Sequence, residues 1–341
     1  MLKRISKAVF VIIGTLIGAG FASGQEIYLF FYRYGINGIM GILISSILLG
    51  MMIDKVFIIC KERQIKNYKE FLNIFVKNER QLDIFNTTIN IFILVTFYIM
   101  IAGFGAYFEQ QFGLNSLIGS SILATICFFV FLNNISGLIK INQILVPILV
   151  GSLCVIGIMV IDPKNIVEFS NYMLQNDDWK WFLDGILYTS YNAILLIPIL
   201  IALRNLVESK KENRTISIVT VILVILLSCI IFFMLAKVDV NIENLEMPAV
   251  YIVSKISKIV EYLYGFIILS SILTTSVSLG TSFLENVSKK EKSYKQIAIF
   301  ICISSILVSK IGFSNLVSFL YPIFGYIGLI QMIGIMLLKS K

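Results

Sequence analysis

The chain has 341 residues, of which 58% are hydrophobic and 14% charged, and its formal net charge is +8. Soluble domains are about half apolar and a quarter charged, so this composition excludes a disordered chain, a disulfide scaffold and an ordinary soluble globule. The five cysteines lack CxxC spacing and histidine is absent, which excludes most zinc sites and histidine acid–base chemistry. In a membrane protein, excess Lys and Arg indicates cytoplasmic loops rather than a nucleic-acid partner.

A membrane span needs about 20 predominantly apolar residues, and ten segments meet this requirement. They are 8–32, 36–59, 84–108, 116–132, 138–161, 181–203, 216–236, 259–283, 294–310 and 313–338. The basic residues before the first segment and the small residues within it also resemble a signal peptide. Because no soluble secreted domain follows, we favour a first transmembrane helix, and hence an all-α membrane protein with ten transmembrane helices.

The distribution of Lys and Arg over the connecting loops predicts the orientation of the chain. With the N-terminus inside, 21 of the 28 basic residues lie on the cytoplasmic side, as the positive-inside rule requires. Both termini are then cytoplasmic in a bacterial plasma-membrane protein. Helical spacing further predicts an amphipathic interfacial helix within Glu62–Asp83 and a short outer helix from Pro248 through Ser257.

The first span is rich in small residues. Between Gly14 and Glu26 it holds four glycines, two alanines and two small hydroxyl residues, which weaken a helix. A break here would expose N–H groups that attract a carboxylate and carbonyl groups that hold a cation. The alternative is a face of small residues for close helix packing, which the spacing of Gly14 and Gly18 also fits.

The sixth span carries consecutive polar residues, Tyr188 to Asn192, and Pro198 can free a carbonyl near Ile194. Spans one and six therefore both look interrupted. Division near residue 178 gives two halves, 1–178 and 179–341, with five spans each. An odd number of spans per half requires inverted topology, and interrupted helices in corresponding positions indicate a transporter site.

The eighth span places hydroxyl residues on one helical face. They are Ser271, Thr274, Thr275, Ser278 and Ser282. Hydroxyl and carbonyl oxygens suit a hard alkali cation. Alternatively, these hydroxyls bond back to carbonyls of their own helix.

Three carboxylates lie in or near the spans. Glu26 follows the small-residue segment, whereas Asp184 and Glu261 lie near the outer starts of their helices and are expected to be interfacial. Intramembrane carboxylates are functional by default. Glu26 therefore binds a cation, takes a proton or recognises a substrate amine, unless it pairs with Arg33 or caps local backbone.

The segment Gly14–Glu26, continued by Phe30–Gly35, resembles the first helix of the YkvI-like bacterial membrane proteins. These belong to the amino acid–polyamine–organocation superfamily, whose members share the LeuT-type five-plus-five inverted repeat. The resemblance implies that the whole chain is one transporter domain with discontinuous helices one and six.

The resemblance also implies the positions of two sites. The solute site is expected between helices one, three, six and eight, with residues Ile17, Gly18, Ala19, Gly20, Ala22, Ser23, Glu26, Tyr98, Tyr188, Thr189, Ser190 and Asn192. The sodium site is expected at Gly14, Ile17, Ser271, Thr274 and Thr275. No lysine lies mid-span in helix five, which favours sodium over a fixed ammonium group.

These observations predict a secondary transporter of a small amino-acid-like solute that works by alternating access and is coupled to Na⁺, with H⁺ as the other candidate ion. No further cofactor is expected, and the partners are the solute and the lipid bilayer. An amino-acid-sensing receptor of the same superfamily, similar to spore-germinant receptors, is the alternative. An enzyme is not expected, because the sequence lacks a credible nucleophile–base set.

Overall fold

The computed structural model describes residues 1–76, 78–160, 179–236, 245, 247–288, 291–311 and 313–338. This described part is almost entirely helical and contains no strand. Its first half comprises α1 (Leu2–Leu16), α2 (Ala19–Ala22), α3 (Gln25–Phe30), η1 (Tyr32–Tyr34), α4 (Ile36–Glu62), α5 (Tyr68–Leu72), α6 (Glu79–Phe112), α7 (Ser116–Phe131) and α8 (Asn134–Val160). Its second half comprises α10 (Lys180–Leu203), η2 (Arg204–Leu206), α11 (Lys210–Leu235), α12 (Pro248–Ser254), α13 (Lys258–Val287), α14 (Glu291–Val308), η4 (Ser309–Ile311) and α15 (Phe313–Leu337).

Eight helices of the described chain are long and apolar enough to cross a membrane: α4, α6, α8, α10, α11, α13, α14 and α15. The chain is therefore a multi-span membrane protein. Of the ten segments predicted as spans, 116–132 forms the shorter apolar helix α7 and 8–32 is broken into α1, α2 and α3. The assignment of ten spans stays a prediction.

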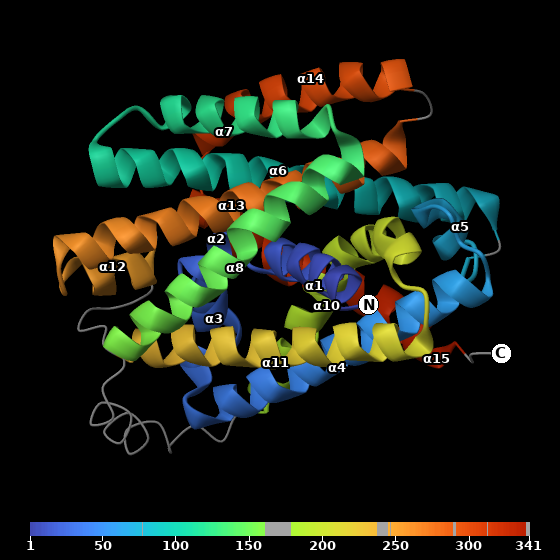
Figure 1. The fold of residues 1–341 in the computed structure, drawn as a ribbon, viewed down its shortest axis with the longest axis horizontal. Coiled ribbons are helices and arrows are strands. Elements are labelled where there is room, and N and C mark those ends of the chain that lie inside the picture. The colour runs from blue at the N-terminus through green and yellow to red at the C-terminus, as the bar shows by residue number, and fades with distance from the viewer. Residues whose placement is uncertain are drawn as a thin grey trace.

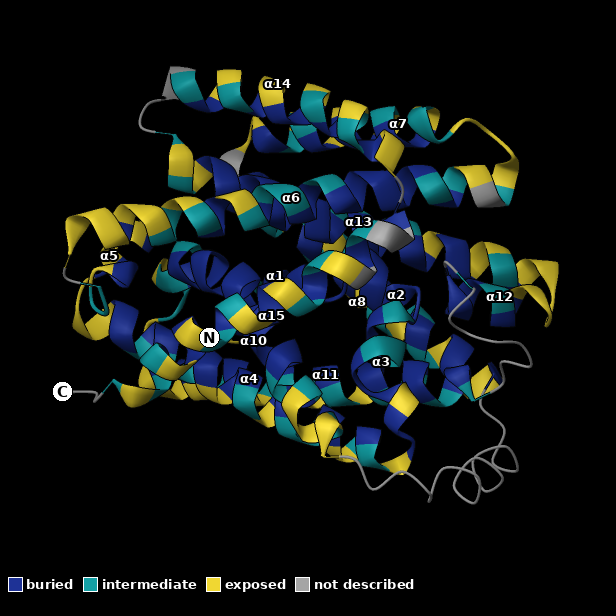
Figure 2. Ribbon diagram, turned by 180° about the vertical axis from the view of Figure 1, so that it is seen from behind, coloured by how far each residue is buried: buried dark blue, intermediate teal, exposed yellow. Residues whose placement is uncertain are grey.

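The helices form layers around the broken first span (Figure 1). Helices α6, α7 and α14 lie on one side of α1 and α2, and α4 and α11 lie on the other. Helix α1 packs against α8, α11 and α13, and it is buried along most of its length (Figure 2). In α10 and α13, 89% of the most apolar stretch is buried, so these two helices enclose the centre while the outer helices present apolar side chains to lipid.

The two short helices predicted from the loops are both present in part. Helix α12 confirms the short outer helix beginning at Pro248. The predicted interfacial helix is much shorter than expected, because Tyr68–Leu72 forms α5 whereas Glu79–Asp83 already belongs to the start of α6. Tyr68 and Phe71 are buried, and the Gln331 side chain of α15 donates a hydrogen bond of 2.6 Å to the Tyr68 hydroxyl. These contacts anchor α5 to the helix bundle.

The break predicted in the sixth span is wrong: α10 runs without interruption from Lys180 to Leu203. Its polar side chains bond to carbonyls one turn earlier in the same helix. Thr189 donates to Gly185 at 3.1 Å, and the Asn192 amide donates to Tyr188 at 2.9 Å. Because such back-bonding satisfies polar side chains inside the membrane, their presence does not require the helix to unwind.

Close packing of α4 on the end of the first span gives a stability prediction. A Cβ atom at Gly38 would lie 2.0 Å from the Phe31 carbonyl oxygen, so Gly38→Ala must push α4 away from this turn. We expect overpacking to destabilise the protein by about 1–3 kcal/mol, measured as a lower thermal unfolding midpoint. Gly151→Ala in α8 is the control, since nothing lies within 4 Å of its Cβ position; equal midpoints for both variants would contradict the packing shown here.

Candidate solute and ion site

The first span is interrupted twice, as its small residues predicted. Helix α1 ends at Leu16, and Ile17 and Gly18 leave the helical conformation before α2 begins. A second interruption lies at Gly24, whose φ of 86° is left-handed and favours glycine. The backbone of the first span therefore presents carbonyl groups at the end of α1 and N–H groups at the start of α2, where an intact helix would bond them internally.

A hydroxyl group of α13 lies on the carbonyl side of this break. Thr275 Oγ1 is 2.9 Å from the Gly14 carbonyl oxygen and 3.1 Å from that of Ile17. Thr275 and both backbone residues are buried. The structure thus brings together three of the five residues predicted for the sodium site, and all three contribute neutral oxygens.

The other two predicted ion ligands also lie on α13, where Thr274 directly precedes Thr275 and Ser271 lies one turn earlier. Thr274 Oγ1 donates to the Ser271 carbonyl at 3.0 Å, and Ser271 Oγ donates to the Ile268 carbonyl at 2.8 Å. The neutral-oxygen set fits a hard alkali cation. Groups of three or more His, Cys, Asp or Glu that could hold a metal are absent from the described residues, so the donor chemistry here does not suit a transition metal.

The amide of Asn142, on α8, is a ligand candidate that the sequence analysis did not identify. Its side-chain oxygen lies 1.8 Å from where a Cβ at Gly14 would be, and in the described part of the chain this buried oxygen has no hydrogen-bond partner. Asn142 Nδ2 donates to the Leu138 carbonyl at 2.9 Å, which orients the oxygen as an acceptor toward α1. A buried acceptor without a donor is costly and would be satisfied by a cation at this position.

Glu26 lies on the other side of the break. It is 1% exposed, and its Oε1 atom lies 2.4 Å from where a Cβ at Gly20 would be. Tyr191 donates a long hydrogen bond of 3.5 Å to Oε1, whereas Oε2 is buried and has no hydrogen-bond partner among the described residues. The pairing with Arg33 considered from the sequence does not occur in the structure. The carboxylate instead faces the backbone of α2.

Aromatic side chains of α10 and α15 line the region around Glu26. Tyr191 stacks on Tyr321 with ring centroids 4.6 Å apart, and Tyr188 packs edge-on against Phe31 at 4.9 Å. Of the predicted solute residues in α10, Tyr188 joins this cluster. The Thr189, Ser190 and Asn192 side chains instead bond to backbone carbonyls or to a methionine sulfur.

The third-span residue chosen from the sequence faces elsewhere. The Tyr98 hydroxyl lies 2.7 Å from Ser304 Oγ of α14, away from the break. Residues further along α6 approach α2 instead: Met100 Sδ is 3.5 Å from the Ala19 backbone nitrogen, and a Cβ at Gly103 would lie 3.4 Å from that of Ala19. Met100 and Gly103 are both apolar, as are most residues of this helix. Their position beside the break therefore could not be identified from the sequence.

The outer end of the break is covered by α12 and α13. The Ala249 backbone nitrogen donates to the Ser23 carbonyl at 2.9 Å, and the Tyr264 hydroxyl donates to the Ala22 carbonyl at 2.8 Å. Ala22 and Ser23 therefore present carbonyl groups that are already bonded. These contacts close one side of the site and hold α2 in place.

Comparison with known proteins supports the membrane-transporter architecture. The chain is 29% identical over 344 residues to the uncharacterised membrane protein YkvI of Bacillus subtilis, an alignment that covers 98% of this chain and 96% of YkvI. The resemblance to YkvI-like membrane proteins is confirmed. The uncharacterised protein YyaD of the same organism is 24% identical over 335 residues, covering 97% of this chain and 96% of YyaD. No protein-family model matches the chain.

A solved structure shows the same fold. The structure of a Na⁺-coupled sialic acid symporter in a substrate-bound, outward-open state superposes with a TM-score of 0.71 at 14% sequence identity. The match covers 98% of this chain and 79% of the symporter. The chain therefore has the same fold as this symporter.

In the YkvI-like chain, a polar cluster connects the end of the first span to the start of α10. Asp184 accepts hydrogen bonds from the Arg33 guanidinium and, at 2.5 Å, from the Tyr34 hydroxyl. Burial, together with the nearby Asp184 carboxylate, raises the pKa of Tyr34 to about 12, so the phenol remains a donor at neutral pH. Asp184 therefore acts as a latch between the first span and α10, and its interfacial position stays a prediction.

Breaking this latch is expected to favour opening at that end. Asp184→Asn removes the charge that holds Arg33, worth about 1 kcal/mol for a partly exposed pair. A cysteine placed at the buried Ser23 should then react about fivefold faster with a membrane-impermeant thiol reagent, in a background whose five native cysteines are replaced. Glu261→Gln removes a carboxylate held by Gln111 of α6 and should leave the rate unchanged. Equal labelling rates in the two variants would contradict a role for Asp184 in keeping this end of the protein closed.

Proposed function

We propose that this protein is a secondary active transporter that moves a small amino-acid-like solute together with Na⁺. The observation that carries the proposal is the contact of Thr275 with the Gly14 and Ile17 carbonyls at the break in the first span. Under this proposal, ten spans form inverted repeats, 1–178 and 179–341, within one transporter domain. Five main helical segments in each half of the described chain support this division.

The ion site proposed here uses residues from three helices. The Gly14 and Ile17 carbonyls and the Thr275 hydroxyl would be ligands, with Ser271, Thr274 and Asn142 completing the oxygen set. A bound Na⁺ would supply positive charge for these neutral oxygens. Thr275 and Asn142 orient their oxygens toward the end of α1. Because all of these ligands are neutral oxygens, they would bind a proton poorly. The similar fold of a Na⁺-coupled symporter supports sodium as the coupling ion.

The proposed solute site lies beyond the break, between α2, α3, α10 and α15. Backbone groups of Gly18, Ala19 and Gly20 would bind one polar group of the solute, and Glu26 would bind its ammonium group. The Glu26 Oε2 atom, which has no hydrogen-bond partner among the described residues, supports this role, because a buried carboxylate without a cationic partner is stabilised by a positive charge. Tyr188 and Tyr191 supply an aromatic wall. Tyr98 is not part of this site.

Alternating access follows from where the ion ligands lie. Thr275 connects α13 to the first span, so an ion held at this contact would favour the conformation in which α1 and α13 are close together. Differential affinity for two conformations is sufficient to couple the ion to the solute. The Lys and Arg distribution supports a plasma-membrane protein with both termini in the cytoplasm.

The test is uptake by the purified full-length protein in liposomes, using a mixture of radiolabelled amino acids. We expect accumulation under an inward Na⁺ gradient and little under an inward K⁺ gradient of equal size. Accumulation under an inward proton gradient without Na⁺ would reassign the coupling ion to H⁺. Saturable amino-acid binding without flux under any gradient would contradict a transporter and would support the amino-acid-sensing receptor.

A further inference from the structure

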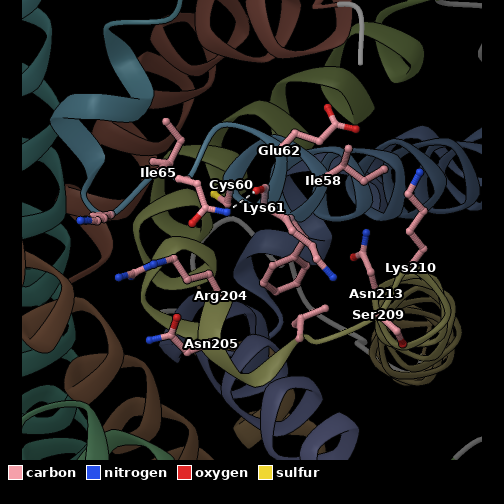
Figure 3. A pocket seen from close by; sticks show the side chains of 14 residues that line it. Ile58, Cys60, Lys61, Glu62, Ile65, Arg204, Asn205, Ser209, Lys210 and Asn213 are labelled. Carbon is pink, nitrogen blue, oxygen red and sulfur yellow. Dashed lines mark hydrogen bonds between the residues drawn. The ribbon is translucent and has the colours of Figure 1, made fainter. Parts of the chain in front are cut away.

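A basic pocket lies away from the proposed transport site, toward the end of the molecule that carries α5 and the C-terminus (Figure 1). Its volume is about 270 Å³. The last turn of α4, the connection 62–66, η2 and the first turn of α11 form its walls (Figure 3). The pocket thus lies where two segments distant in sequence, 57–66 and 204–213, meet.

Four cationic side chains line this pocket against one carboxylate, that of Glu62. The cations are Lys61, Lys66, Arg204 and Lys210. The salt bridges found among the described residues involve none of these four. Lys61 donates to the backbone carbonyl of Glu208, and Arg204 donates to that of Ile201 at 2.9 Å. The charge of the pocket is therefore largely uncompensated by the protein itself.

Neutral polar groups of the 26-residue helix α11 complete the wall. Ser209 caps its N-terminus, where the Glu212 carboxylate also accepts hydrogen bonds from the Glu208 and Ser209 backbone nitrogens. Asn213 is 4% exposed, and its Nδ2 atom donates to the Asp54 carbonyl at 3.0 Å. The four cations therefore supply the anion-binding groups of this concave site, and they match an anion that carries several oxygens.

We propose that this pocket binds a phosphate ester, presented either by the head group of an anionic phospholipid or by a free phosphorylated molecule. The distribution of Lys and Arg along the chain assigns this end to the cytoplasmic side, where basic pockets between transmembrane helices bind anionic head groups. A phosphate here would join the end of α4 to η2 and to the start of α11. The site is independent of the proposed transport activity, and it is tested without measuring flux.

The test has two arms, both on delipidated full-length protein in detergent. In the first arm, native mass spectrometry follows titration with phosphatidylglycerol or phosphatidylcholine. In the second arm, thermal unfolding is followed with glycerol 3-phosphate or inorganic phosphate, against chloride at equal ionic strength. We expect phosphatidylglycerol to bind about tenfold more tightly than phosphatidylcholine if the source is lipid, or a raised unfolding midpoint with phosphate if it is soluble.

The double substitution Lys66→Gln with Lys210→Gln removes two exposed pocket cations and should weaken the binding seen in either arm about tenfold. Lys140→Gln with Lys258→Gln removes the same charge from exposed positions outside the pocket and should bind as the wild type does. Lys210→Arg should keep the affinity. Equal binding of the two lipids with no effect of phosphate, or wild-type affinity in the pocket double variant, would overturn the proposal.

Discussion

Thr275→Val should raise the Na⁺ concentration needed for half-maximal uptake at least about fivefold. The substitution keeps the shape of the side chain but removes the oxygen that contacts the Gly14 and Ile17 carbonyls. Losing one such buried polar partner costs about 1–3 kcal/mol, which corresponds to this change or more. The measurement is radiolabelled solute uptake into proteoliposomes as a function of external Na⁺.

Two substitutions separate the ion site from a general effect on α13. Thr275→Ser retains the hydroxyl and should retain most of the Na⁺ affinity. Ser276→Ala removes a neighbouring buried hydroxyl that donates only to the Ile272 carbonyl of its own helix, at 2.7 Å, and should leave Na⁺ dependence unchanged. If Thr275→Val has the Na⁺ dependence of the wild type, Thr275 is a structural contact between α1 and α13.

Glu26→Gln should reduce solute uptake about 10- to 100-fold without lowering the thermal unfolding midpoint. The amide occupies the same space beside Gly20, but it lacks the charge expected to hold an ammonium group, a charge-assisted bond worth about 1.5–3 kcal/mol. Folding should not suffer, because removing a buried charge that lacks a cationic partner is neutral or stabilising. Uptake and unfolding are measured on the same preparation.

The control for Glu26→Gln is Glu285→Gln, which removes an exposed carboxylate from α13 and should leave uptake unchanged. Binding the ammonium group of the solute and carrying a coupling proton are two different roles for Glu26, and they give different results in this experiment. If Glu26 carries a coupling proton, the variant will lose gradient-driven accumulation but keep solute exchange across the membrane. Full uptake by Glu26→Gln would remove Glu26 from the transport site.

Much of the architecture could be predicted from the sequence, because span length and apolar composition depend on the bilayer rather than on tertiary contacts. The break in the first span was also predictable. Gly18 lies at the first interruption, and the left-handed conformation of Gly24 at the second follows from the intrinsic freedom of glycine. The convergence of Thr275 on Gly14 was implied by a family resemblance, since no spacing rule connects residues 261 positions apart.

Other parts could not be predicted, for identifiable physical reasons. The polar run of the sixth span looks the same whether it unwinds the helix or bonds back to it, and in α10 it bonds back. The side of α6 that faces the break depends on rotation of a nearly uniformly apolar helix, so Tyr98 was chosen where Met100 makes the contact. Asn142 was missed because its significance depends on Gly14 lying opposite it.

The most direct test is thermal unfolding of the purified protein with a panel of amino acids, in NaCl and in KCl at equal concentration. A ligand that binds only the folded state raises the unfolding midpoint by mass action. We predict that at least one amino acid stabilises the protein in Na⁺ but not in K⁺, and that Thr275→Val abolishes this difference. Identical midpoints in the two salts for every amino acid would contradict a sodium-coupled solute site at the broken first helix.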